Sequence, residues 1–583
     1  MNPELLLAHF DRISDAPDAI PRLRSFILDL AVRGKLVEQD PKDEPASELL
    51  KRIQVEKVRL VKNGKISTQQ PVPQIGAEEL PFPAPSGWNW ARLAAISRRI
   101  HYGFTASANP SLKDVRLLRI TDIQNNQVDW SSVPGCEISE REVDQYKLQQ
   151  GDILIARTGG TIGKTFLVSQ IPVTAVFASY LIRVQKSSEF YDRYLKFFLE
   201  SPAYWKQLQE GARGGGQPNV NGQTLGKITV VVPPLAEQHR IVTKVDELMA
   251  LCDRLEAERN EQESRRDRLA AASLHHLNNG ANSEAFRNYA RFYLSHLPRL
   301  TTRPEHVQPF RQTILNLAVR GQLIPQDSNA EPVDTLLSKN DRVRQQIVRT
   351  DRRADTDRQV LLAAEDKWNI PPSWCWSALA DLVLFIDYRG KTPVKTEKGV
   401  RLITAKNVKK GFINPSPEEF LSERDYHIWM TRGFPKEGDI LFTTEAPMGN
   451  AAVVRLSKRF ALAQRVICFR PYHAVIPNFL TLQLLAEPFQ RILDKTATGL
   501  TAKGIKAAKL RRLPVAVPPI AEQHQIVARV DELMTLCSQL EGQLATSQTG
   551  TCRLLESVLY HAIKDSAVDW KTPLTHSARR FRD

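Results

Sequence analysis

The sequence has few cysteines and lacks a long apolar run. Its six cysteines are Cys136, Cys252, Cys375, Cys468, Cys537 and Cys552. They form no CxxC pair, which argues against a zinc ribbon or a disulfide framework and favours a reducing cytosol. No stretch approaches the ~18 apolar residues that cross a bilayer, and the start, MNPELLLAHFDRISDAP, does not resemble a secretory signal. We therefore expect a cytoplasmic chain without membrane contacts.

Motifs of nucleic-acid enzymes are also missing. DNA amino-methyltransferases carry a [DN]PP[YF] loop, but the nearest strings, NPSL at 109–112 and NPSP at 414–417, lack its second proline and its aromatic residue. No PD…ExK set of metal-binding acids is present, and GARGGG at 211–216 has the wrong context for a dinucleotide-binding loop. The sequence therefore predicts a chain with no catalytic residues, no metal site and no cofactor of its own.

One glycine-rich segment comes close to a phosphate-binding loop. TGGTIGKT at 158–165 has Thr158 where the P-loop pattern requires glycine, and the following TFLVSQIPV has the composition of a strand rather than a helix. A Walker-B carboxylate is not recognisable either. We therefore interpret the segment as a loop whose backbone amides and Lys164 approach a phosphate or a base edge.

Positive charge exceeds negative charge. Lys and Arg number 80 against 65 Asp and Glu, which gives a net charge of +15 (80 − 65), and the sequence pI is about 9.5. Because lysines and arginines that neutralise phosphates release counterions, this balance favours a polyanionic partner. Many soluble proteins are basic for no specific reason, so the charge supports a nucleic-acid partner without establishing it.

The chain repeats itself. VPPLAEQHRIVTKVDELMALCDRLE at 232–256 and VPPIAEQHQIVARVDELMTLCSQLE at 517–541 are identical at 18 of 25 positions, at an offset of 285. Upstream, ILDLAVRGKLVEQD at 27–40 matches ILNLAVRGQLIPQD at 314–327 at ten of 14 positions. Weaker echoes lie between them, GWNWARL with SWCWSAL and GDILIA with GDILFT. The chain is therefore two copies of a unit of roughly 285 residues, far longer than a solenoid repeat.

The two copies differ mainly in their interiors. Residues of about 95–230 and 380–515 have diverged almost beyond recognition, whereas simple drift would have eroded the flanks as well. One architecture with a changed surface favours two domains that bind two different targets. The interiors contain β-branched runs such as VRLLRITDI, GDILIAR and TAVFASYLIRV, with a helical patch at 190–208. We expect a mixed α/β domain in each copy.

Helices flank each interior. PRLRSFILDLAVRG has helical spacing and ends at Gly34, and a second helix is expected at 44–62, with its counterpart starting at Glu331. Each Pro-Pro then opens a long helix with Glu237 or Glu522 in its first turn. Both long helices show the apolar spacing of a coiled-coil seam: Ile241, Val245, Leu248, Cys252 and Leu255, then Ile526, Val530, Leu533, Cys537, Leu540 and Leu544. About 40 residues span about 60 Å, so two such helices packed antiparallel would hold the interiors apart at a fixed separation.

These features predict an α/β (α+β) fold with an internal two-fold repeat. Two mixed α/β domains, called variable domains 1 and 2 below, are separated by long antiparallel coiled-coil helices. The expected parts are an N-terminal helical arm (1–80), variable domain 1 (81–235), a central spacer helix (236–278), a linker with a second arm (279–365), variable domain 2 (366–520), a distal spacer helix (521–566) and a tail (567–583).

The residues that close each variable domain resemble a known family. Pro-Pro-x-Ala-Glu-Gln-His-x-Ile-Val, at 233–242 and 518–527, resembles the specificity subunits of type I restriction–modification systems. The GDIL strand with its following loop, GQPNVN at 216–221 and GLTAKGIK at 499–506 resemble the same family, and the LAVRG arm resembles its longer branch. The likeness covers nearly the full chain, twice over.

This resemblance implies a DNA-binding specificity subunit without an active site. In such subunits the variable domains are target-recognition domains, and each reads one half of a bipartite, asymmetric sequence in double-stranded DNA. The helices bind two methyltransferase subunits, which supply S-adenosylmethionine binding and adenine methylation. A motor-nuclease restriction subunit, which uses ATP and Mg, joins for cleavage. Half-sites about one helical turn apart suit a rigid spacer.

Candidate DNA contacts lie in the loops of the variable domains, because Arg, Lys, Asn and Gln can read base edges in the major groove. In variable domain 1 we expect contacts from Tyr102, Thr105, Arg157, Thr158, Lys164, Gln217, Asn219 and Asn221. In variable domain 2 we expect them from Arg389, Lys391, Thr392, Thr444, Glu445, Lys503 and Lys506. The recognised bases and the half-site spacing do not follow from the sequence, because readout depends on loop geometry.

Two alternatives stay open at this point. A free-standing scaffold could join two protein partners through its variable domains, and it would bind no duplex, or all duplexes equally with steep salt dependence. An enzyme in its own right, a methyltransferase or a nuclease, is the weaker alternative because its motifs are missing.

Overall fold

The computed structural model describes residues 16–67, 73–211, 220–279, 283–326, 331–350, 359–388, 393–463, 465–499 and 503–564. The chain forms two compact units. Unit 1 holds Met1–Gln262 and Gln548–Asp583, and unit 2 holds Glu263–Ser547. Both borders fall inside long helices, α10 (Leu235–Asn278) and α19 (Ile520–Lys564), which match the expected spacer helices to within two residues. The antiparallel packing of these helices and the seven-part division of the chain stay predictions.

Each unit contains the predicted two-helix arm. The arm helices are α3 (Ala19–Val32) and α4 (Ala46–Lys62) in unit 1, and α12 (Val307–Val319) and α13 (Val333–Thr350) in unit 2. Gly34 follows α3 with a φ of +66°, and Gly321 follows α12 with a φ of +68°, a conformation that favours glycine. A Cβ atom would lie 2.5 Å from Pro85 Cγ at the first position and 2.4 Å from Pro371 Cγ at the second. The repeated glycine therefore ends the helix and admits the proline segment beside it.

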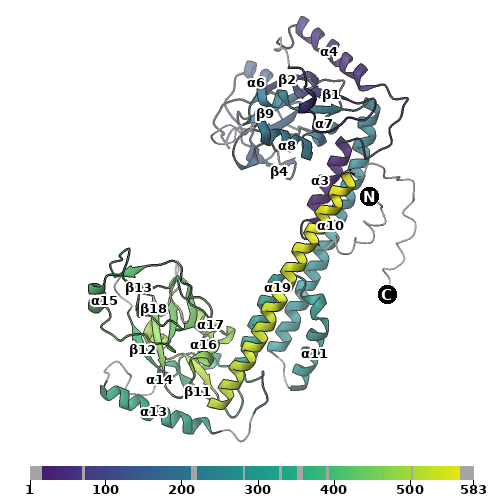
Figure 1. Ribbon diagram of the computed structural model, residues 1–583. Helices are drawn as coiled ribbons and strands as arrows, with labels where there is room; N and C mark the ends of the chain where they lie inside the picture. The colour runs from purple at the N-terminus through teal and green to yellow at the C-terminus, as the bar shows by residue number, and fades with distance from the viewer. Residues whose placement is uncertain are drawn as a thin grey trace. The chain divides into compact units, whose positions relative to one another are not determined.

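The second arm helix packs against a short helix at the start of each variable domain. These short helices are α5 (Leu93–Ile96) and α14 (Leu379–Leu382), and Figure 1 shows α14 beside α13 in unit 2. In unit 1, Lys57 Nζ donates to the carbonyl of Ala94 at 2.6 Å. In unit 2, Asn340 Nδ2 donates to the carbonyl of Asp381 at 2.7 Å. The two copies thus attach their arms at the same place with different side chains.

Both variable domains are built on a four-stranded antiparallel sheet with the same strand order. In unit 1 the order is β2 (Ser97–Tyr102), β9 (Leu181–Lys186), β6 (Ile153–Ala156) and β7 (Thr165–Leu167). In unit 2 it is β12 (Val383–Asp387), β18 (Val466–Pro471), β15 (Ile440–Thr444) and β16 (Met448–Val453). The GDIL segments are therefore inner strands of the two sheets, as their apolar character requires.

A separate parallel strand pair accompanies each sheet. The pairs are β3 (Arg116–Leu118) with β8 (Ala175–Phe177), and β13 (Val400–Ile403) with β17 (Phe460–Leu462), to which β14 (Phe420–Leu421) adds an antiparallel edge. Unit 1 also has a short hairpin of β4 (Ile123–Gln124) and β5 (Gln127–Val128). The domains are thus mixed α/β, as predicted.

Two helices follow the strand pair and complete each core. They are α7 (Asp192–Phe198) and α8 (Pro202–Gly211) in unit 1, and α16 (Pro477–Leu485) and α17 (Glu487–Thr496) in unit 2. The predicted helical patch at 190–208 is therefore two helices, separated before Pro202. Phe198 and Tyr204 are fully buried in unit 1, as are Phe479 and Phe489 in unit 2. Burial of each such ring contributes roughly 1.5–3 kcal/mol. Shorter helices are α6 (Glu140–Tyr146) and α15 (Glu423–Trp429).

A two-stranded ribbon closes each variable domain onto its long helix. The ribbons pair β1 (Asn89–Arg92) with β10 (Thr229–Val232), and β11 (Cys375–Ala378) with β19 (Pro514–Val517). Beside them, Trp88 Nε1 donates to Glu237 Oε2 at 2.8 Å, and Trp374 Nε1 donates to Glu522 Oε1 at 2.9 Å. All four side chains are buried. The repeated tryptophan and glutamate are therefore partners in fixing each domain to its helix.

The predicted seams are buried within each unit. Ile241, Val245 and Cys252 join a core with α3, and Ile526 and Val530 are buried in the core of unit 2. Unit 2 also has α11 (Ser283–Leu300), which packs against the end of α10. In the part of the chain that the structure describes, no helix is long and apolar enough to cross a membrane.

Candidate nucleic-acid interface

The sheets of the two variable domains finish in equivalent ways where β6 and β15 end. After the last ladder pair, Arg157 N donates to the carbonyl of Tyr180 at 3.0 Å, and Thr444 N donates to the carbonyl of Arg465 at 2.9 Å. This register makes Arg157 the counterpart of Thr444, and Tyr180 the counterpart of Arg465. We call the region around each of these pairs the loop end of its variable domain.

Three predicted contacts come together at the loop end of variable domain 1. The Arg157 guanidinium lies over the Tyr102 ring, with its carbon 4.8 Å from the ring centroid. The Tyr102 hydroxyl accepts a hydrogen bond from Gly222 N at 3.0 Å. Asn221 caps α9 (Gly222–Lys227) by accepting a backbone N–H of its first turn at 2.8 Å. The cation–π contact restrains Arg157 beside an aromatic ring that is itself tied to the next segment.

The glycine-rich loop after β6 does not have the architecture of a P-loop. Strand β7 follows it, where a P-loop requires a helix. Thr158 is half-buried and Lys164 is exposed. Gly163 has a φ of +78°, and a Cβ atom there would lie 2.2 Å from Leu208 Cδ2, so this part of the loop is packed against α8. That its backbone amides and Lys164 approach a phosphate or a base edge stays a prediction.

At the loop end of variable domain 2, Thr444 differs from its prediction. Its side chain is 2% exposed, and its hydroxyl donates to the carbonyl of Arg465 at 3.3 Å. This burial corrects its assignment as a surface contact, because Thr444 positions the turn that carries Arg465. Glu445, also a predicted contact, is half-buried, and its Oε1 lies 3.1 Å from Arg465 Nε.

The two predicted lysines of variable domain 2 lie on the adjoining segment. Ile505 N donates to the carbonyl of Thr444 at 3.1 Å, which brings this segment to the loop end. Lys503 is exposed and forms an ion pair with Asp494 at 2.7 Å. Lys506 is exposed and precedes the short helix α18 (Ala507–Leu510). The structure thus places both lysines beside the loop end.

The other predicted contacts are less informative. Thr105 is exposed and follows β2. The remaining five, which lie outside the described residues, are Gln217, Asn219, Arg389, Lys391 and Thr392.

Sequence reasoning missed Tyr180 and Arg465. Tyr180 is 64% exposed, and Arg465 has a φ of +74°, which is uncommon for a residue with a side chain. Tyr180 lies in a turn inside 174–184, a run whose composition predicts one strand but which forms β8, a turn and β9. Arg465 stands directly before β18, at the start of a run of strand-forming residues. The aromatic residue in the middle of the first run was the available signal.

A cavity of about 220 Å³ adjoins Arg465. Lys395 and Lys406 line it, and Lys395 forms an ion pair with Glu419 at 2.8 Å. Ala446, with a φ of +41°, also lines it. The loop end of variable domain 2 therefore combines a basic cavity with two residues in the left-handed region.

His101, which precedes Tyr102, is a structural histidine. Burial, with help from the nearby Arg183 and Arg99, lowers the pKa of His101 to about 3. The ring therefore stays neutral near pH 7 and accepts a hydrogen bond from Arg183 Nε at 2.9 Å. It supports β2 from within the domain.

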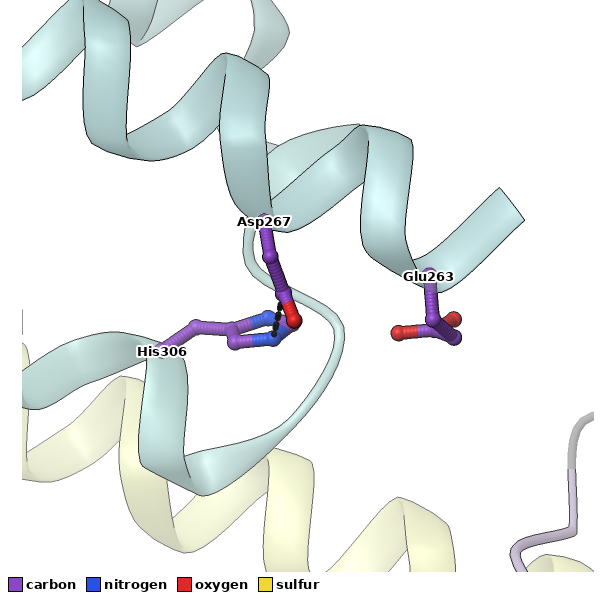
Figure 2. A group of neighbouring side chains, drawn as sticks. All are labelled: Glu263, Asp267 and His306. Atoms are coloured by element: carbon purple, nitrogen blue, oxygen red, sulfur yellow. Dashed lines mark ion pairs between the residues drawn. The ribbon is translucent and has the colours of Figure 1, made fainter. Parts of the chain in front are cut away.

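One group of three potential metal ligands occurs among the described residues. The ligand atoms of Glu263, Asp267 and His306 lie within 4.8 Å of one another (Figure 2). His306 Nε2 and Arg303 Nη2 each lie 3.1 Å from Asp267 Oδ1, and Glu263 pairs with Arg266. Because two arginines already balance the two carboxylates, we interpret the group as an ion-pair network that joins α10 to the turn before α12.

Comparison with known proteins gives a consistent result. The family described as "Type I restriction modification DNA specificity domain" matches residues 114–262 and 431–547. The Escherichia coli "Type I restriction enzyme EcoAI specificity subunit" is 31% identical over 93% of this chain and 94% of its own length. The E. coli "Type I restriction enzyme EcoEI specificity subunit" is 28% identical over 92% and 93%. A crystal structure of the HsdS subunit from Thermoanaerobacter tengcongensis aligns with a TM-score of 0.41 at 17% identity, over 84% of this chain and 100% of that one. The chain belongs to the specificity subunits of type I restriction–modification systems, in the long form with a helical arm before each variable domain.

Proposed function

We propose that the chain selects the DNA sequence for a type I restriction–modification assembly, and that each variable domain reads one half of a bipartite, asymmetric target. The observation that supports this proposal is that the two variable domains share one strand order but have different loop ends. Arg157 and Tyr180 in one domain correspond to Thr444 and Arg465 in the other. Two such surfaces on one chain suit a target whose halves differ.

The chemistry belongs to partner subunits. Two methyltransferase subunits bind S-adenosylmethionine and methylate adenine, and a restriction subunit with ATP and Mg cleaves the DNA. The chain itself contributes no catalytic group and holds no cofactor. The DNA target places the assembly in the cytoplasm.

Methylation mapping tests this function. The full chain is expressed with its methyltransferase partner in a host free of other adenine methylation, and the genome is compared with that of a strain that has the partner alone. We expect one bipartite N6-methyladenine motif that disappears without the chain. An identical methylation pattern in both strains, with an active partner, would overturn the specificity role.

A further inference from the structure

The two loop ends carry an arginine on opposite strands. In variable domain 1 the arginine, Arg157, directly follows the inner strand β6, and its backbone N–H donates to Tyr180 in the turn before β9. In variable domain 2 the threonine Thr444 ends β15, and the arginine, Arg465, stands in the turn before β18. Arg465 of variable domain 2 therefore occupies the backbone position that Tyr180 occupies in variable domain 1.

Arg465 makes three polar contacts, two at its backbone carbonyl and one at its side chain. Its carbonyl accepts hydrogen bonds from both the backbone N–H and the hydroxyl of Thr444, at 2.9 and 3.3 Å. Its Nε pairs with Glu445 Oε1 at 3.1 Å. Glu445 therefore contacts the guanidinium at Nε. An oriented guanidinium loses less freedom on binding than a mobile one.

The backbone around Arg465 points to a binding role. Arg465 has a φ of +74° and Ala446 a φ of +41°, and both line the 220 Å³ cavity. Non-glycine residues in this region carry strain, and such strain gathers at binding sites, where the surrounding structure enforces it.

The charge at the cavity fits a nucleic acid. Lys395, Lys406 and Arg465 supply three positive charges against two carboxylates, Glu419, which pairs with Lys395, and Glu445, which pairs with Arg465. Lysines suit phosphate oxygens as point charges, whereas a fixed guanidinium matches the O6 and N7 acceptors of guanine in the major groove. The two lysines therefore suit the phosphate backbone of DNA, and the Arg465 guanidinium suits a base edge.

We propose that Arg465 is a guanine-binding residue of variable domain 2, oriented by Glu445, and that Arg157 over Tyr102 has the same task in variable domain 1. This inference rests on the proposed function and adds the base that each loop end reads. Each half of the target then contains a guanine, read from opposite strands of the two sheets.

The test maps methylation directed by the full chain with its methyltransferase partner. Arg465→Ala is expected to relax one guanine position in one half-site, with a loss of discrimination on the order of tenfold or more. Arg157→Ala is expected to relax a position in the other half-site. Arg465→Lys keeps the charge but not the fork, so it is expected to relax the same position as Arg465→Ala. In each variant the unaffected half-site shows that the chain still folds.

Arg459→Ala is the matched control. Arg459 precedes β17, at the opposite end of the strand from Arg465, and it also pairs with a surface carboxylate, Glu423, at 2.6 Å. This variant is expected to leave both half-sites unchanged. An unchanged motif in Arg465→Lys overturns the inference, including when Arg465→Ala abolishes all methylation. Equal weakening of every site would make Arg465 a phosphate contact and also overturn it. A wild-type chain that directs no motif would instead refute the proposed function.

Discussion

The two variable domains share a frame and differ at their loop ends. Both place the GDIL strand in the interior of a sheet with the same order, and both close on a long helix through a tryptophan–glutamate hydrogen bond. Yet eight residues, 157–164, connect β6 to β7, whereas three, 445–447, connect β15 to β16. The difference teaches that the two copies agree where packing fixes the sequence and differ at the loop ends, where we propose that the chain contacts DNA.

The shared frame itself contains one difference that predicts the largest effect. Asp152 and Asp439 occupy the same place in the GDIL motif and pair with arginines at 3.3 and 2.8 Å. The Arg183 side chain is 3% exposed, whereas that of Arg470 is 31% exposed. Asp152→Ala leaves Arg183 buried without its carboxylate, so we expect a loss of about 3–5 kcal/mol in the free energy of unfolding. Asp439→Ala lets Arg470 turn to water and is expected to cost about 1–2 kcal/mol.

Urea unfolding of the full-length variants measures this difference. Glu532→Ala serves as the control, because its ion pair with Arg529 is exposed and is expected to contribute less than about 1 kcal/mol. Equal losses of unfolding free energy in Asp152→Ala and Asp439→Ala would show that the greater burial of Arg183 does not make its ion pair more important for stability.

The arm glycines predict an equal effect in the two units. Gly34→Ala and Gly321→Ala each force a Cβ atom against a proline ring in a left-handed conformation. We expect each to destabilise its unit by about 2–4 kcal/mol, from backbone strain and steric overlap together. Gly64→Ala is the control, because Gly64 has the same φ of +66° but no atom within 4 Å of the added Cβ. It is expected to cost about 1–2 kcal/mol.

Thermal and urea unfolding of these three variants sharpen the comparison. Similar losses at Gly34 and Gly321 support one arm architecture in both copies. A loss at either of them no larger than at Gly64 would contradict the packing role of the proline segment.

The repeated flanks were predictable because their side chains obey local rules. Glycine after a helix, Pro-Pro before one and apolar residues at heptad spacing each follow from backbone chemistry, and the structure has all three. The strand GDIL was recognisable from its composition. Most of the helices and strands that the two copies share could therefore be predicted from the sequence.

The loop ends were only partly predictable because long-range contacts form them. Tyr102, Arg157 and Asn221 were recognised by residue type, but their meeting depends on segments far apart in the chain. Arg465 was missed because it stands at the start of a predicted strand, and its place at the loop end depends on the register of β18 with β15. The burial of Thr444 follows from a neighbouring strand. The chemistry of the side chains indicated which residues are suited to contact DNA. The register of the sheet determines which of these residues lie on the same surface.

The helix-start glutamates offer the smallest and most discriminating test. Burial raises the pKa of Glu237 above its usual value, against the opposing effect of the Trp88 hydrogen bond, and its Oε1 has no hydrogen-bond partner among the described residues. Glu522 Oε1 instead accepts from both Trp374, at 2.9 Å, and Gln326, at 2.7 Å. Because the folded carboxyl of Glu237 binds its proton more tightly than the unfolded one, its contribution to stability is present at low pH. That contribution is lost as the pH rises through the folded pKa.

Glu237→Gln removes this loss while keeping an acceptor for Trp88. At pH 8 we expect the variant to be more stable than the wild type by roughly 1 kcal/mol, because a buried charge is no longer left partly unsatisfied. The gain should shrink as the pH falls through the raised pKa of the folded protein, and it should be lost below the ordinary pKa of 4.5, where Glu237 is protonated in both states. Glu522→Gln should gain less, since two donors already bind one oxygen of that carboxylate, whereas Glu237 accepts from one donor only in the part of the chain that the structure describes, Trp88. Unfolding temperatures at pH 8 and at pH 4 measure both effects, and a gain independent of pH would show that packing, and not ionisation, distinguishes the two helix starts.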